Sequence, residues 1–203
     1  MTLDQFKQVW ARAAEKAAAR EKDYSALDAA AGGDGDHGEA IVAATKALAS
    51  AQGDDFKSLL SDMVEHLESD VSGSTSSLYG TLFEGMADAV DAGVTELDAA
   101  GVADLFAAGL EELGFATKAK VGDKTFMDAL IPAVEARKAH AAEGEPAMFA
   151  AAAAAAKAGS EATAQMQARY GRAKNLGERS IGPIDAGAAS NADIWSCFAD
   201  VES

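Results

Sequence analysis

The chain has 203 residues, a net charge of −16 at pH 7 and an isoelectric point near 4.4. Such an excess of negative charge argues against nucleic acid or an anionic membrane surface as a partner. Hydrophobic residues make up 49% of the chain, but only 6% of it is aromatic. A composition rich in alanine and poor in proline favours helices.

Cysteine content and apolar runs indicate the compartment. The single cysteine, Cys197, excludes an internal disulfide and fits a reducing environment. The longest apolar run, residues 147–156, is too short to span a bilayer, and the first residues form a charged amphipathic stretch rather than a signal peptide. We therefore expect a cytoplasmic protein without a membrane segment.

Helical periodicity begins at the first residues of the chain. Thr2-Leu3-Asp4-Gln5 matches a capping box, and apolar residues at helical spacing then predict a helix over 3–20. Further helices are predicted, in chain order, at about 39–51, 56–67, 78–92, 94–113, 126–140 and 146–167, with a last helix that holds Ile194, Trp195 and Phe198.

Polar, glycine-containing loops separate these helices, at 33–38, 72–77, 122–125 and 171–187. No strand-like alternation and no linker interrupts the pattern. We predict one all-α domain over residues 1–203, built of about eight helices. Because the loops alternate with long helices, an up-and-down topology would bring several of them to one end.

The loop at 33–38 reads Gly-Asp-Gly-Asp-His-Gly and is the most informative stretch of the chain. Glycine and aspartate favour turns and irregular backbone. The loop would hold Asp34 and Asp36 close together, as Mg²⁺ requires when it binds one or two carboxylates together with substrate phosphates. Taken alone, the same six residues also fit a solvated acidic turn between two helices.

Two better-known loop types do not fit this stretch. It matches the glycine spacing of a dinucleotide-binding loop, but no strand precedes it, and two carboxylates would repel a bare pyrophosphate. An EF-hand fails because Gly38 stands where the third oxygen ligand belongs.

Other polar residues complete a possible phosphate site. Asp28 lies just upstream and can add a third carboxylate. Ser74, Thr75 and Ser76 precede an apolar helix, where hydroxyls and backbone N–H groups can meet an anion. Arg179 can clamp phosphate oxygens with two hydrogen bonds. Simple N-capping by the serines and a local ion pair of Arg179 are the alternatives.

Four segments of the chain, in this order, resemble signatures of the nucleotide-binding L subunit of dihydroxyacetone kinase, the DhaL family. The loop at 33–38 resembles its metal loop. Leu78–Thr81 resembles the helix after its phosphate loop, and Gly122–Ala133 resembles its third signature. Gly171–Ala173 and Leu176–Gly182 together resemble its lid region.

The resemblance implies an antiparallel barrel of eight α-helices that binds ADP or ATP at one end. Two Mg²⁺ ions, held by three aspartates, would grip the phosphates, and the implied ligands are Asp28, Asp34 and Asp36. The implied catalytic residues are His37, beside the phosphates, and Arg179. The implied nucleotide contacts are Ser74, Thr75 and Ser76 at the phosphates, Gly122 and Met127 near the adenine, and Arg179 and Asp185 in the loop that closes the site.

Three departures from the family pattern indicate a divergent branch. The step from Asp28 to Asp34 is one residue longer than is usual. The phosphate loop reads Ser-Gly-Ser-Thr-Ser-Ser at 72–77, where Gly-Gly-Ala-Ser-Gly-Pro is common. Ala186 stands where a proline is common, which predicts a looser lid and favours exchangeable ATP over retained ADP as the donor.

We therefore expect a phosphoryl-transfer subunit of a kinase for dihydroxyacetone or a related ketotriose or ketotetrose. The resemblance places the ketose on a separate K-type subunit and adds a phosphotransferase-system subunit as a possible further partner. The same loops are also compatible with a non-catalytic Mg·ADP- or Mg·ATP-binding regulator that acts through its partner, and with a purely structural helical protein.

Overall fold

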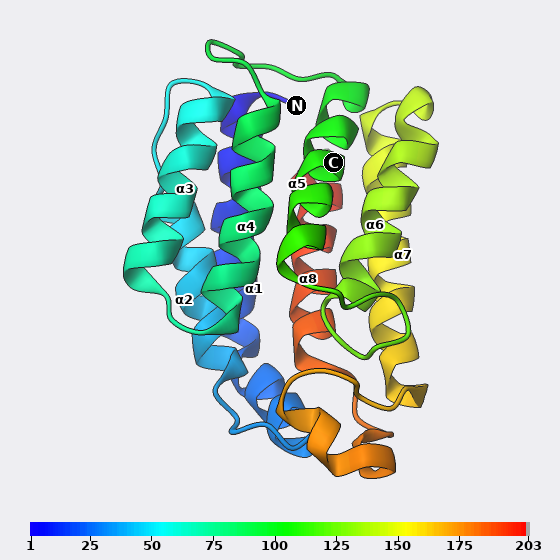
Figure 1. Ribbon diagram of the computed structural model, residues 1–203. Coiled ribbons are helices and arrows are strands. Elements are labelled where there is room, and N and C mark those ends of the chain that lie inside the picture. The colour runs from blue at the N-terminus through cyan, green and yellow to red at the C-terminus, as the bar shows by residue number, and fades with distance from the viewer. Residues whose placement is uncertain (202–203) are drawn as a thin grey trace.

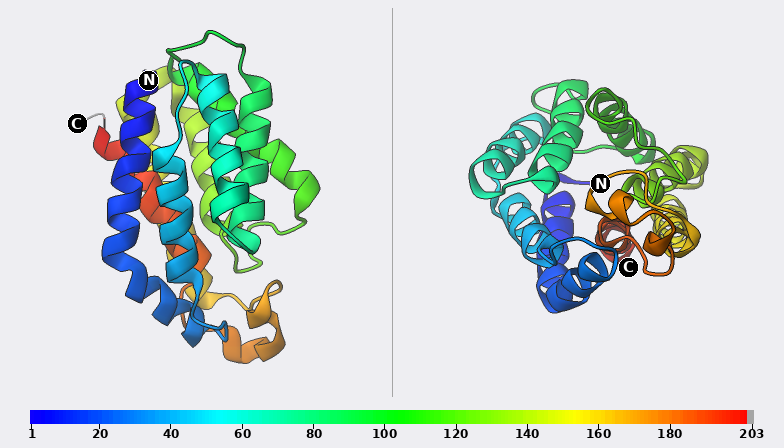
Figure 2. Two further views of the ribbon diagram at one scale, coloured as in Figure 1. Left: turned by 90° about the vertical axis from the view of Figure 1, so that its left-hand side faces the viewer. Right: turned by 60° about the horizontal axis from the view of Figure 1, so that its bottom comes forward.

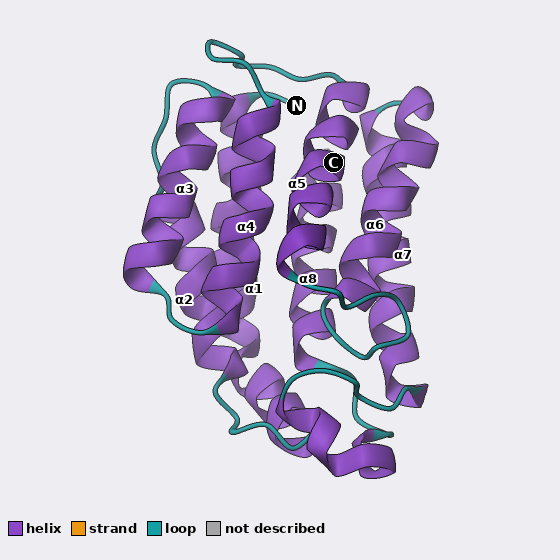
Figure 3. Cartoon of the chain, in the orientation of Figure 1, coloured by secondary structure: helices purple, strands orange, loops and turns teal. Residues whose placement is uncertain are grey.

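Eight α-helices make up most of residues 1–201, the part of the chain that this computed structural model describes (Figures 1 and 3). No β-strand occurs within these residues, where Thr2 and Glu96 form an isolated bridge. The helices are α1 (Leu3–Ala30), α2 (His37–Ser50), α3 (Phe56–Asp70), α4 (Ser74–Ala89), α5 (Ala99–Ala116), α6 (Met127–His140), α7 (Glu145–Ala162) and α8 (Ala186–Val201). Three short 3₁₀ helices are η1 (Ala141–Glu143), η2 (Thr163–Gln165) and η3 (Arg172–Ser180).

The helices form a closed ring, which confirms the predicted all-α antiparallel barrel. Each helix packs against the next in sequence, and α8 packs back against α1 (Figure 2, right). Because the direction alternates, the loops after α1, α3, α5 and α7 all lie at one end, at the bottom of Figure 3. These are the four polar loops that the sequence predicts.

Two helix boundaries differ from the prediction by enough to matter. α1 continues to Ala30, ten residues beyond the predicted end, because six of residues 21–30 are Ala, Leu, Glu or Lys, which are good helix formers, and the ring of Tyr24 is buried against the barrel. α5 begins at Ala99 rather than 94, since the Asp98 side chain caps it by accepting a hydrogen bond from Gly101 N at 2.8 Å. The longer α1 brings Asp28 to the loop end of the barrel.

Smaller shifts occur at two other helices. α4 begins at Ser74, so the predicted phosphate-loop serines lie in its first turn rather than ahead of it. The alanine-rich α7 ends at Ala162, where the predicted helix runs to 167, and η2 follows it. Within the residues described, no helix is both long enough and apolar enough to cross a membrane.

Aromatic side chains fill the middle of the ring. Trp10 packs edge-on against Phe83, and Phe198 contacts the rings of Phe6, Trp10, Phe106, Phe149 and Trp195. Arg137 of α6 is fully buried among four of these rings, with its guanidinium carbon 4.1–4.8 Å from their centres. The nitrogens of this guanidinium have no hydrogen-bond partner among the described residues. Cation–π attraction and the charge of Glu145 therefore compensate the buried charge.

Candidate functional site

A cavity of about 520 Å³ opens at the end of the barrel where the four loops meet. Its wall comes from the α1–α2 loop, the first turn of α4, the loop before α6, η3 and the start of α8. The volume lies in the range of small-molecule and cofactor sites. Of the predicted site residues, those on the wall are Asp28, Asp34, Asp36, His37, Ser74, Thr75 and Asp185.

Three carboxylates meet at one side of this cavity. Each of Asp28, Asp34 and Asp36 offers an oxygen, and the three oxygens lie within 4.8 Å of one another. Asp28 stands on the last turn of α1, and its Oδ2 accepts a hydrogen bond from Gly35 N at 2.8 Å. Its carboxylate lies so close to Gly33 that a Cβ at that position would come within 2.1 Å of Oδ1. Glycine at 33 is therefore what allows Asp28 to join the two loop aspartates.

Desolvation, hydrogen bonds and nearby charges change the acidity of two of these groups. Burial, a hydrogen bond to Asp34 and the nearby charges of Asp34 and Asp28 raise the pKa of Asp36. Desolvation opposes ionisation of Asp34 as well, but its ion pair with Arg172 and further hydrogen bonds hold its pKa below the ordinary value. A carboxylate set of this kind is suited to hold a hard divalent cation.

His37 begins α2 and lies on the cavity wall directly after the acidic loop. Its Nε2 is 2.9 Å from Ser190 Oγ, and the edge of its ring meets the ring of Tyr24. Burial lowers the pKa of His37, while the charges of Asp28 and Asp36 and a hydrogen bond to the Ala186 carbonyl act in the opposite direction. Contacts from α1 and α8 thus hold the ring in one place.

The first turn of α4 faces the carboxylates across the cavity. Gly73 precedes it with φ of +84°, a conformation that favours glycine, and no side chain caps the free N–H groups of this turn. Ser74 and Thr75 line the cavity. Ser76 does not, since its hydroxyl donates to the Leu67 carbonyl of α3 at 2.7 Å. This contact is not the N-capping that the sequence left open as an alternative, because no side chain caps α4.

Asp185 and Lys124 lie on the cavity wall near the root of the lid segment, residues 166–185. Lys124 is buried and donates from Nζ to the carbonyls of Thr163 and Pro183, so it joins α7 to the lid. Asp185 Oδ2 accepts a hydrogen bond from Ala188 N at 2.8 Å and thereby caps α8. Burial raises the pKa of Asp185 to about 6, although Lys124 and this hydrogen bond pull it down.

The lid contains η3, drawn in orange at the bottom of Figure 1. Arg172, at the start of η3, forms an ion pair with Asp34, and the Leu176 side chain lies against Gly32. η3 therefore closes onto the acidic loop. Arg179, at the other end of η3, is exposed and does not line the cavity.

Gly122 and Met127 also lie off the cavity wall. The buried carboxylate of Asp128 accepts hydrogen bonds from Gly122 N at 2.6 Å and Thr125 N at 2.7 Å, and so shapes the loop before α6. Met127 is buried in the core at the start of α6. The part of this loop that does line the cavity is formed by Thr117, Ala119, Lys124, Thr125 and Phe126.

Sequence reasoning assigned no site role to three residues that the structure brings to the site. Arg172 had a signal, because it follows Gly171 in the lid signature and adds a cation to an acidic chain. Lys124 was read as part of a plain loop, and a buried lysine cannot be told from a surface one by pattern alone. Ser190 lies 153 residues from His37 in the sequence, so only the closed ring makes it a neighbour.

Comparison with known proteins is decisive at this point. The DAK2 domain family matches residues 30–200. The chain belongs to the DAK2 domain family. Within it, the chain is 32% identical over 181 residues to the ADP-binding subunit DhaL of PEP-dependent dihydroxyacetone kinase 2 from Listeria innocua, a match that covers 85% of this chain and 82% of the relative.

Two further relatives are longer proteins. The DAK2 chain is 37% identical to D-erythrulose kinase from Mycolicibacterium smegmatis, with 92% of this chain and 33% of the relative covered. Its fold matches the crystal structure of the dihydroxyacetone kinase of C. freundii with a TM-score of 0.74 and 26% identity, over 98% of this chain and 34% of that one. The same kinase is also known in complex with AMP-PNP and Mg²⁺. The chain thus spans about a third of these two kinases.

The raised pKa of Asp185 predicts a pH-dependent stability. A carboxyl group whose pKa rises from 3.8 to about 6 on folding binds more protons in the folded than in the unfolded state over that range, so stability falls as pH rises through it. Asp185→Asn removes this charge and keeps an oxygen for Ala188 N. The stability difference, which is the free energy of unfolding of the variant minus that of the unmodified protein, should therefore rise by about 1 kcal/mol from pH 5 to pH 8.

Urea unfolding of the metal-free protein at the two pH values measures this difference. Asp104→Asn, at an exposed position of α5, is the matched control and should show no such gain. An equal stability difference between Asp185→Asn and the unmodified protein at both pH values would contradict the assignment.

Proposed function

We propose that this DAK2 domain is the nucleotide-binding, phosphoryl-transfer subunit of a ketose kinase, with ADP or ATP as its nucleotide and dihydroxyacetone or a related ketotriose or ketotetrose as acceptor. The observation that carries the proposal is the meeting of three carboxylates and an uncapped helix N-terminus across one cavity. The names of its relatives, which are ADP-binding kinase subunits and an erythrulose kinase, favour the same function.

Magnesium is the metal that fits the donor set. Asp28, Asp34 and Asp36 provide only hard oxygen ligands, their oxygens converge, and the cavity beside them leaves room for phosphate oxygens. Mg²⁺ held there would neutralise phosphate charge. The family resemblance implies two such ions, and the proposal adopts that number. Bound cations would also offset the repulsion between the nucleotide phosphates and a chain of net charge −16.

The chain's own residues then position the nucleotide. The free N–H groups and hydroxyls at Ser74 and Thr75 meet phosphate oxygens, and Arg172 approaches from the lid. His37, held by Ser190, supports the phosphates from the side of α2. The buried rings of Tyr79 and Phe126, which face the same cavity, form an apolar wall for the base. Roles for Ser76, Gly122, Met127 and Arg179 rest on the resemblance alone.

Phosphoryl transfer needs little covalent chemistry from the protein, so positioning, charge neutralisation and exclusion of water account for most of it. In this chain η3, with Arg172 and Leu176 resting on the acidic loop, is the element that excludes water. Asp185 and Lys124 hold the root of that lid. Closure of the lid over the nucleotide therefore belongs to the proposed mechanism.

The acceptor is proposed to arrive on a second protein. Four large apolar side chains are exposed in the described part of the chain, and all of them stand in the segments at the cavity end: Phe115, Val121, Tyr170 and Ile181. Exposed apolar side chains gathered around a site favour a protein partner. We take that partner to be a K-type subunit that carries the ketose. A phosphotransferase-system subunit is a further proposed partner, in keeping with the names of PEP- and PTS-dependent relatives.

The metal site can be tested by removing one negative charge at a time. Asp34→Asn or Asp36→Asn should abolish Mg²⁺-dependent ADP binding, because a lost charged ligand removes several kcal/mol, by order of magnitude, from a metal–phosphate site. Calorimetric titration with ADP and Mg²⁺ measures the affinity. Asp88→Asn, which removes an exposed carboxylate on α4, should bind as the unmodified protein does. Near-normal Mg·ADP affinity in both site variants would rule out this metal site.

The lid contact gives a second test with a matched pair of variants. Arg172→Ala and Lys174→Ala each remove one positive charge from η3, but only Arg172 lines the cavity. Loss of hydrogen bonds from Arg172 to a charged phosphate should weaken Mg·ADP binding roughly tenfold or more. Lys174→Ala should change it little. Equal losses in the two variants would show that general charge, and not the position of Arg172, is what matters.

A further inference from the structure

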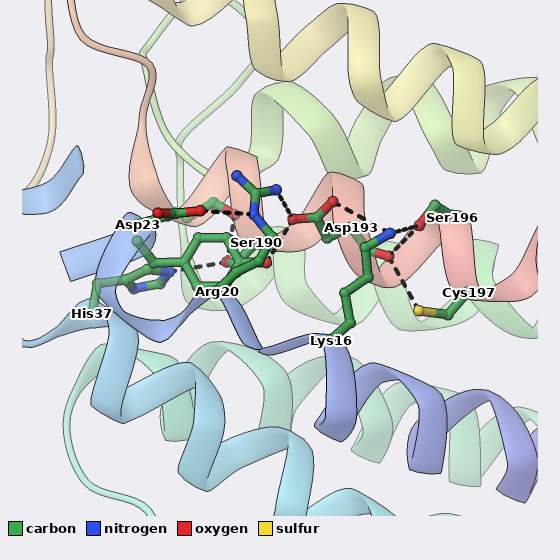
Figure 4. Close-up of polar contacts among 10 residues, drawn as sticks. Lys16, Arg20, Asp23, His37, Ser190, Asp193, Ser196 and Cys197 are labelled. Carbon is green, nitrogen blue, oxygen red and sulfur yellow. Dashed lines mark hydrogen bonds and ion pairs between the residues drawn. The ribbon is translucent and has the colours of Figure 1, made fainter. Parts of the chain in front are cut away.

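The ring of His37 is held by Tyr24 of α1 and by Ser190 on one face of α8. Ser190 and Asp193 stand three residues apart on that helix and so project from the same side, toward α1 and α2. Ser190 contacts His37 directly, with Oγ 2.9 Å from Nε2. Figure 4 shows this contact beside the row of polar side chains that continues along α1 and α8.

Asp193 reaches His37 through a second residue. Its Oδ2 accepts a hydrogen bond from the hydroxyl of Tyr24 at 2.6 Å and is paired with the Arg20 guanidinium. The Tyr24 ring is buried and forms a T-shaped contact with the His37 ring, with 6.4 Å between the ring centres and an angle of 77° between the planes. Arg20 also lies over the Tyr24 ring, 5.1 Å from its centre. Tyr24 is therefore held both at its hydroxyl and at one face of its ring.

The two contacts constrain His37 in complementary ways. The Ser190 hydroxyl defines where Nε2 points, and the buried Tyr24 ring restricts rotation of the imidazole from the side. An active-site group acts within a narrow range of positions, and partners one layer behind it commonly set that position. Tyr24 and Asp193 are absent from the cavity wall, so they do not themselves meet a ligand in the cavity.

We propose that Tyr24 and Asp193 are positioning residues for His37, and that through it they set the phosphate side of the nucleotide site. This inference rests on the proposed function, since it assigns the pair to that same site. The competing explanation is that Asp193 only fastens α1 to α8, as Lys16 does with its contacts to Asp193 Oδ1 at 3.5 Å and Ser196 Oγ at 2.6 Å.

Tyr24→Phe separates these explanations, because it removes one hydroxyl and leaves the Asp193 charge paired with Arg20 and Lys16. Lys16→Met is the control, as it removes a contact to the same carboxylate on the oxygen that Tyr24 does not use. The chain has three histidines, and His66 and His140 lie on other helices. NMR of the imidazole C–H signals at one fixed pH, without metal or nucleotide, therefore resolves His37 with two internal references.

In Tyr24→Phe the His37 signals should shift or broaden while those of His66 and His140 stay in place, and the affinity for ADP with Mg²⁺ should fall about tenfold. Lys16→Met should leave the His37 signals and the affinity unchanged. Asp193→Asn, which keeps an acceptor for Tyr24 but loses its charge, serves as a second variant and should lie between the two in both measurements.

Unchanged His37 signals in Tyr24→Phe would overturn the inference, and so would an equal loss of affinity in Lys16→Met. If Tyr24→Phe does not fold, Asp193→Asn decides by the same two readouts. Failure of the unmodified protein to bind ADP with Mg²⁺ would overturn the proposed function instead, and the His37 signals, recorded without nucleotide, would then decide the positioning of the ring by themselves.

Discussion

The convergence of Asp28, Asp34 and Asp36 is the constraint on which the rest of this end of the molecule depends. Three carboxylates whose oxygens lie within 4.8 Å repel one another and must be compensated. The structure supplies part of that compensation through Gly35 N, which donates to Asp28, and through the Arg172 ion pair with Asp34. Desolvation, a hydrogen bond to Asp34 and the charges of Asp34 and Asp28 still raise the pKa of Asp36. A divalent cation would complete the compensation.

The barrel explains how these groups come together. Alternating helix directions carry four polar loops to one end, and the closed ring sets α8 beside α1 so that Ser190 reaches His37. The interior of the barrel has a structural role. There aromatic rings pack around the buried Arg137 and fill the core, while the candidate site lies at the loop end.

Sequence patterns predicted the helices and their arrangement well because apolar spacing, alanine content and glycine-rich breaks are local signals. The loop at 33–38 and the upstream Asp28 could be found in the same way, although only the longer α1 and the space at Gly33 show how Asp28 reaches the loop. Contacts between distant segments were out of reach. The ion pair of Arg172 with Asp34 and the link of Lys124 to Pro183 join residues far apart in the chain, and no local pattern encodes such pairs. Arg179 shows the opposite case. It was predicted to contact the phosphates, but it lies seven residues after Arg172 and does not line the cavity.

The central claim is that this end of the barrel binds a nucleotide only when a divalent cation offsets the carboxylates. Calorimetric titration of the unmodified protein with ADP, once with Mg²⁺ and once with a chelator, tests it most directly. The account predicts saturable binding with Mg²⁺ and its loss when the metal is removed. Equal binding in both conditions, or no binding with Mg²⁺ present, would contradict it.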